Sequence, residues 1–226
     1  MARTPKPVHE QFFDRDPVPL ARALVGTVLR RRLGGQWLAA KIVETEAYAL
    51  DEPASHSSLG RTPSREPMFA PPGTLYLYWS RGGPSLNLSA RGSGDAVLIK
   101  AAVPHVDSVS PPQALEHMRT LLPPLANGPR ATHRLCSGQS LLCRALDLHV
   151  KEWTGLRFDP ARFVLEDLGD RPELVQARRL GISAVRSTGL PWRFVHREHV
   201  RSATKNPLTR RGAAQGVDYW MLPSGG

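Results

Sequence analysis

The sequence predicts a single domain of mixed α and β structure. Its 226 residues, 41% of them hydrophobic, are enough to enclose one sizeable core and few for two. Strand-like runs bounded by turn residues fill positions 25–103, whereas helical spacing dominates after Pro104. Because neither an internal repeat nor a linker divides the chain, we expect one domain over residues 10–203. A flexible segment is expected at 1–9 and a loosely ordered tail at 204–226.

A helix and a β-hairpin are the first predicted elements. Asp16 and Pro17 form a helix-start signal, and the helix that follows ends by Gly26. Residues 27–33 and 37–48 have the composition of strands, and the two glycines between them suit a two-residue hairpin turn. These residues are therefore expected to form the first antiparallel pair of a sheet.

A long loop and a meander follow the hairpin. Residues 49–72 are rich in Pro and Ser, and a loop of this length inside a compact domain is usually functional. Three more strands are predicted at residues 75–79, 86–89 and 96–103. Helices are predicted at 113–122 and 137–148, the second with Ser137 as its N-cap, and short strands and turns at 160–199.

The charge balance narrows the class of partner. The formal net charge is +10 and the pI is about 10.4, which favours a polyanion, nucleic acid before an anionic membrane surface. A basic protein without a nucleic-acid role is the alternative on charge alone. Two cysteines, Cys136 and Cys143, fit buried thiols on one helix in a reducing cytoplasm. No apolar run is long enough to span a membrane.

The strand at 37–48 carries the best candidate for catalysis. Its apolar residues give way to Glu44, Glu46 and Tyr48, and strict alternation places these three on the face of the apolar even-numbered positions 38–42. A carboxylate that meets a planar substrate beside apolar neighbours suits proton transfer. Glu46 is the candidate base and Glu44 a candidate ion-pair partner for an arginine. An exposed glutamate at a strand end is the plain alternative.

Rings and cations accompany this carboxylate. Tyr76 and Tyr78 alternate along one strand, so both point to one face, where they either stack on a base, worth about 1–3 kcal/mol, or pack as ordinary strand residues. His56 lies in the Ser-rich loop. Nearby cations suited to phosphates are Arg61, Arg65, Arg81 and Lys100. We find no phosphate-binding Gly-rich loop, metal-ligand spacing or nucleophile elbow.

Several separated motifs resemble one known family. The chain carries, in order, Val-Glu-Thr-Glu-Ala-Tyr at 43–48, Ala-Ser-His-Ser at 54–57, Met-Phe at 68–69, Pro-Gly-Thr-Leu-Tyr at 72–76, Asn87, Ala-Val-Leu-Ile-Lys-Ala at 96–101, Leu-Cys-Ser-Gly at 135–138, Arg-Leu-Gly-Ile at 179–182 and Pro-Trp-Arg-Phe at 191–194. Over about residues 10–200 it resembles the mammalian-type 3-methyladenine (alkyladenine) DNA glycosylases. The order of the motifs makes the resemblance specific.

The resemblance implies a fold and an activity. The fold is mixed α+β, a single compact domain with a curved antiparallel β-sheet wrapped by helices and loops. The activity is base excision repair: an alkylated or deaminated purine is flipped out of damaged double-stranded DNA, and water hydrolyses its N-glycosidic bond to leave an abasic site. The implied enzyme is monofunctional and needs no metal or cofactor. We expect a monomer in the cytoplasm, associated with the nucleoid if the source is bacterial, and no membrane partner.

The resemblance also assigns roles to residues. Glu46 matches the glutamate that activates the water, and Tyr48, His56 and Tyr78 match the walls of the base pocket. Asn87 matches the pocket residue that disfavours guanine by crowding its exocyclic amino group. Met68 matches an apolar residue near the lesion in the DNA-facing loop.

Two positions depart from the family pattern. Arg81 stands where a wedge tyrosine is typical, and Lys100 stands where arginine is frequent, so a two-pronged contact becomes a point charge. With Arg61 and Arg65, both are expected to contact DNA.

Two other functions stay open at this stage. A DNA-binding protein of the same fold that has lost turnover is favoured by Arg81 and Lys100 and disfavoured by the intact Glu46. A hydrolase of small nucleosides is disfavoured by the net charge of +10. The preferred lesion is also open among 3-methyladenine, 7-methylguanine, hypoxanthine and ethenoadenine.

Overall fold

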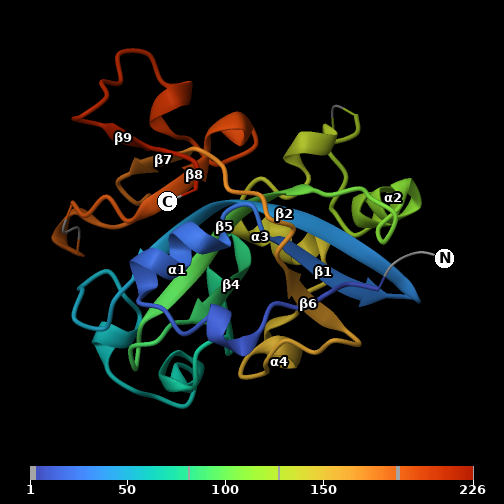
Figure 1. The fold of residues 1–226 in the computed structure, drawn as a ribbon, viewed down its shortest axis with the longest axis horizontal. Coiled ribbons are helices and arrows are strands. Elements are labelled where there is room, and N and C mark those ends of the chain that lie inside the picture. The colour runs from blue at the N-terminus through green and yellow to red at the C-terminus, as the bar shows by residue number, and fades with distance from the viewer. Residues whose placement is uncertain (1–3, 81, 127, 187–188, 226) are drawn as a thin grey trace.

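An antiparallel sheet organises the fold (Figure 1). The computed structural model describes residues 4–80, 82–126, 128–186 and 189–225. Nine strands pair in the described residues. They are β1 Val28–Leu33, β2 Gln36–Tyr48, β3 Leu75–Ser80, β4 Gly83–Ser89, β5 Ala96–Pro104, β6 Phe163–Glu166, β7 Leu174–Ala177, β8 Arg193–His196 and β9 Tyr219–Leu222. The order is β3-β4-β5-β2-β8-β7-β9, with β1 paired to β2 and β6 to β1, so the predicted mixed α+β fold is confirmed.

Helices lie around this sheet (Figure 1). They are α1 Pro17–Leu24, α2 Pro112–Thr120, α3 Gln139–Ala145 and α4 Val150–Trp153. The first begins at Pro17 as predicted and buries Leu20 and Leu24 against β2. The prediction of Ser137 as the N-cap of α3 is wrong. The N-cap is Gly138, whose φ of 120° suits only glycine. Within the described residues, the helices are all too short or too polar to cross a membrane.

The predicted first hairpin is confirmed. Its strands β1 and β2 pair from Val28 with Lys41 to Leu33 with Gln36. The intervening Gly34 and Gly35 have φ of 56° and 79°, as a type I′ turn requires. This turn sends β2 back across the middle of the sheet (Figure 1).

A pair of bulges changes which residues of β2 face the core. The register between β2 and β5 skips Val43 on one strand and Lys100 on the other. Before the skipped residue, the even-numbered positions 38–42 pack in the main apolar core. After it, the odd-numbered Ala47 does so. The prediction that Glu46 shares the face of positions 38–42 is therefore wrong, since an extra residue reverses the alternation. Glu46 points to the other side of the sheet.

Both ends of the described chain are tied to the sheet. The backbone N–H of Lys6 donates to Glu166, at 2.8 Å, and that of Val8 to the carbonyl of Leu165, at 2.9 Å. Residues 6–8 therefore lie along β6. Within the tail, β9 pairs with β7. Tyr219 and Met221 of β9 add apolar contacts beside β7 and β8. The Gly-rich composition around this strand gave no sign of it in the sequence.

A buried ion pair joins the tail to β2. Arg193 donates from Nε to Glu44 Oε1 at 2.7 Å, with both side chains almost fully buried. The backbone N–H of Thr204 donates to the other carboxylate oxygen at 2.7 Å, and Arg193 also donates to the carbonyl of Lys205 at 2.9 Å. Glu44 is thus the ion-pair partner that the sequence predicted, and it fixes the chain beyond β8.

Breaking this pair should destabilise the fold strongly. Arg193→Ala leaves the Glu44 carboxylate buried without its cation, which costs about 3–5 kcal/mol. The matched control is Arg210→Ala, because Arg210 pairs with Asp218 at 2.6 Å on the surface, where an ion pair contributes about 0–1 kcal/mol. The free energy of unfolding in urea measures both losses. Equal losses in the two variants would contradict a structural role for the buried pair.

Candidate active site

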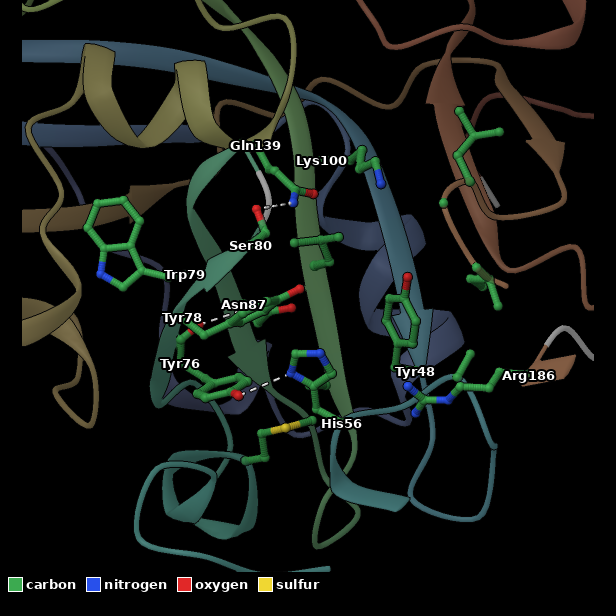
Figure 2. Close-up of a pocket in the computed structure, with 18 of the residues that line it drawn as sticks. Tyr48, His56, Tyr76, Tyr78, Trp79, Ser80, Asn87, Lys100, Gln139 and Arg186 are labelled. Carbon is green, nitrogen blue, oxygen red and sulfur yellow. Dashed lines mark hydrogen bonds between the residues drawn. The ribbon is translucent and has the colours of Figure 1, made fainter. Parts of the chain in front are cut away.

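A cleft of about 860 Å³ opens beside Tyr48 and Lys100 (Figure 2), two residues that hydrogen-bond to Glu46. Strands β2, β3, β4 and β5 supply its walls, together with the loop that contains His56 and the segment from Leu180 to Arg186. Glu46 itself is fully buried. Three residues that line the cleft, Tyr48, Lys100 and Leu180, hydrogen-bond to it.

Three hydrogen bonds hold this carboxylate. Glu46 Oε2 accepts from Tyr48 Oη at 2.9 Å and from Lys100 Nζ at 3.3 Å. Its Oε1 accepts from the backbone N–H of Leu180 at 3.0 Å. Lys100 is the residue that the β5 register skips, and bulges commonly re-aim a side chain in this way. The donors come from β2, β5 and a distant loop, so the tertiary fold fixes the orientation of the carboxylate.

Tyr48 is held by a buried arginine. The guanidinium carbon of Arg179 lies 4.6 Å from the centre of the Tyr48 ring. Arg179 pairs with the buried Glu52 and donates to the carbonyl of Ala47 at 2.8 Å. Burial, and next the carboxylate of Glu46, raise the pKa of Tyr48 well above its ordinary value. Tyr48 therefore stays protonated at neutral pH and donates to Glu46.

Three rings form the opposite wall of the cleft. The rings of Tyr76 and Tyr78 stack with centroids 5.5 Å apart, which confirms that they share a face of β3. His56 lies 4.3 Å from Tyr78, and its Nδ1 is 3.2 Å from Tyr76 Oη (Figure 2). Burial raises the pKa of Tyr76 to about 12 and also raises that of Tyr78. Both tyrosines therefore keep their hydroxyl protons at neutral pH.

Two further predicted residues complete the walls. Asn87 is 6% exposed and donates from Nδ2 to the carbonyl of Tyr76 at 3.1 Å. Met68 is buried against Tyr76 and Ala96 and lines the same cleft. Its place is therefore in the cleft wall.

The predicted cations divide into different settings. Lys100 lines the cleft. Arg61 is exposed and forms an ion pair with Glu66, whereas Arg65 donates to the carbonyls of Leu59 and Gly60 at 3.0 and 2.9 Å. Arg81 lies outside the described residues.

Three residues near the site received no individual role from the sequence. Arg179 and Leu180 open the Arg-Leu-Gly-Ile motif, and that motif is the signal that pointed to this segment. Arg186 also lines the cleft, where it donates to the carbonyl of Ser55 at 3.0 Å. No pattern in the sequence marks it. In the part of the chain that the structure describes, no group of three or more His, Cys, Asp or Glu side chains is arranged to hold a metal ion.

Known proteins share much of this sequence. The family model described as methylpurine-DNA glycosylase matches residues 11–200. A Pseudomonas aeruginosa protein named "Putative 3-methyladenine DNA glycosylase" is 50% identical over 218 residues, 96% of this chain and 91% of that protein. A protein of the same name from Pseudomonas savastanoi is 48% identical over 222 residues, 98% and 99% of the two chains. Human DNA-3-methyladenine glycosylase is 40% identical over 185 residues, 76% of this chain and 59% of that protein.

The protonation state of His56 is open to a direct test. Burial lowers the pKa of His56, and the cations Arg186 and Arg65 lower it further. The folded protein therefore binds this proton less readily than the unfolded chain. Above pH about 6.5, the pKa of a free histidine, His56 does not reduce the stability of the folded protein. Below that value, the loss of stability increases as the pH falls.

We expect the His56 ring resonance, assigned by its loss in His56→Gln, to titrate below pH 6.5 in an NMR titration. The midpoint of this titration should rise in Arg186→Gln, which removes one of the two cations. A midpoint above 6.5 would contradict a neutral ring in the cleft.

Proposed function

Because this chain belongs to the methylpurine-DNA glycosylase family, we propose that its cleft excises alkylated or deaminated purines from duplex DNA. The family membership makes it a DNA glycosylase, a hydrolase that acts on N-glycosyl bonds. The observation that carries the proposal is the buried Glu46 carboxylate, held by Tyr48, Lys100 and Leu180, three residues that line an aromatic-walled cleft. A carboxylate and a set of rings are what the hydrolysis of a flipped base requires.

Base flipping explains the rings. A purine inside a duplex hides its sugar carbon, and turning it out costs a few kcal/mol, least for a damaged or mispaired base. Stacking on Tyr78 and His56 on one side and Tyr48 on the other offsets part of this cost. A purine made cationic by alkylation gains further from electron-rich faces.

Hydrolysis follows from the carboxylate. Glu46 orients a water molecule and accepts a proton as the water oxygen bonds to C1′ of the sugar. The bond from C1′ to the purine nitrogen breaks and the base leaves with the bonding electrons, so an abasic site remains. A cationic alkylpurine leaves readily, whereas a neutral base such as hypoxanthine needs a proton or hydrogen bond to leave. With water as the nucleophile, the enzyme is monofunctional.

The proposed partner is damaged double-stranded DNA. The net charge of +10 suits a polyanion, and Lys100 and Arg186 line the cleft into which a nucleotide would enter. We propose that the enzyme acts as a monomer in the cytoplasm, on the nucleoid in a bacterium, without a metal or cofactor.

Replacing the carboxylate tests the proposed function. Glu46→Gln keeps the shape of the side chain but removes the base, so the single-turnover rate of excision from a lesion duplex should fall about 10²–10⁴-fold. The dissociation constant for the same duplex should change little. The control is Glu66→Gln, because Glu66 is an exposed partner of Arg61, and it should keep the wild-type rate.

Either of two results would count against this mechanism. Turnover retained in Glu46→Gln would remove Glu46 from the catalytic role. Tight lesion binding without cleavage in the wild type would favour a binding protein that has lost turnover.

Asn87 is proposed to limit access of guanine. Its amide stands in the cleft wall and is held by Tyr76, so it crowds an exocyclic amino group at purine C2. Asn87→Ser should raise excision of guanine adducts about tenfold, the usual effect of one steric group, and leave adenine lesions nearly unchanged. Single-turnover rates on matched duplexes measure both. An unchanged guanine profile in a folded variant would exclude this role.

A further inference from the structure

Trp79 is a large apolar side chain that the fold leaves uncovered at the edge of the cleft. Leu75 and Leu77, on the same face of β3, are 0% and 2% exposed, whereas Trp79 is 69% exposed. The segment that contains Thr154 lies along the outer edge of β3 and reaches Leu77. The Thr154 hydroxyl accepts from the backbone N–H of Leu77 and donates to its carbonyl, each at 3.1 Å. Figure 2 shows the indole extending from β3 away from the rings of Tyr76 and Tyr78.

A second cleft, of about 400 Å³, lies beside the first. Both clefts are lined by His56, Tyr76, Tyr78 and Trp79, so the ring cluster forms a wall common to the two. Leu59, 57% exposed, also lines the second cleft. Trp79 is therefore not an isolated apolar residue on the surface. It belongs to an apolar recess that is continuous with the wall of the proposed base pocket.

The second cleft also contains a cation. Arg65 lines it, and within the described residues its guanidinium donates to the carbonyls of Leu59 and Gly60. Carbonyl oxygens orient a guanidinium without cancelling its charge. Arg61, nearby in the same loop, instead pairs with Glu66 and lines neither cleft. Arg65 is thus the better placed of the two to meet a phosphate.

We propose that this second cleft is a nucleotide subsite, in which Trp79 stacks on the base that flanked the flipped nucleotide and Arg65 meets a neighbouring phosphate. The proposal rests on the proposed function, because only flipping creates the partner. When a base leaves the duplex, its neighbour loses stacking on one face. An indole placed there restores it, and every base offers such a face, so the contact tolerates any sequence. The shared wall makes the two bound nucleotides close neighbours.

The test pairs a protein variant with a DNA variant. Trp79→Ala should weaken binding to a lesion duplex about tenfold, the size of one stacked base, and Trp79→Phe should restore most of it. The control Val217→Ala removes another exposed apolar side chain, one that lines neither cleft. Replacing one flanking base by an abasic analogue should weaken the wild type similarly. On that duplex, Trp79→Ala should bind with the same affinity as the wild type.

The outcomes separate this subsite from the proposed function. Wild-type excision with equal affinity in Trp79→Ala would overturn the stacking role and leave the glycosylase intact. An equal loss in Trp79→Ala on duplexes with either flanking base removed would overturn it too, since the contact would then not be with a flanking base. A wild type that neither prefers nor cleaves lesion duplexes would overturn the proposed function, and the subsite with it.

The phosphate contact has its own readout. Arg65→Ala should lower the slope of log affinity against log salt concentration by about one, as the loss of one phosphate contact requires. Arg61→Ala should change this slope less, because Glu66 already pairs with it. Equal slopes in Arg65→Ala and the wild type would overturn the role of Arg65.

Discussion

Removing a carboxylate from water costs several kcal/mol unless hydrogen bonds replace the lost solvent, and Glu46 is fully buried. Its three donors belong to β2, β5 and the segment after β7. The active-site arrangement therefore depends on the folding of the whole sheet and not on one motif. The β5 bulge at Lys100 is part of this constraint. Without the bulge, the alternation of side chains along β5 would change, and the Lys100 amine would no longer be directed at Glu46.

The two buried carboxylates of β2 have different partners, and this difference is the reason for proposing Glu46 rather than Glu44 as the base. Glu44 is occupied by Arg193 and by the backbone of Thr204, which lie away from the cleft. The partners of Glu46 are residues that line it. Arg179, paired with Glu52 and lying over Tyr48, extends the same network behind the cleft. One glutamate thus stabilises the fold, and its neighbour is the one held by residues of the cleft.

The sequence predicted much of this arrangement, and the errors have physical causes. Local signals were sufficient for the Gly34–Gly35 hairpin, for α1 and for the shared face of Tyr76 and Tyr78. The face of Glu46 was assigned wrongly because a bulge is a property of strand pairing, which alternation within one strand does not reveal. The contact between Arg179 and Tyr48 joins residues far apart in the chain, so only the tertiary structure shows it. Strand β9 was missed because its four residues lie among polar and glycine positions.

The most direct measurement of the central claim is single-turnover excision by the wild type on labelled duplexes. Each duplex carries one lesion: 3-methyladenine, 7-methylguanine, hypoxanthine or ethenoadenine. A water held by Glu46 beside the ring wall predicts a strand break at the lesion only after alkali treatment, and none in the undamaged duplex. Breaks without alkali would contradict a monofunctional hydrolase. Lesion-specific binding without breaks at any of the four lesions would contradict catalysis by this cleft.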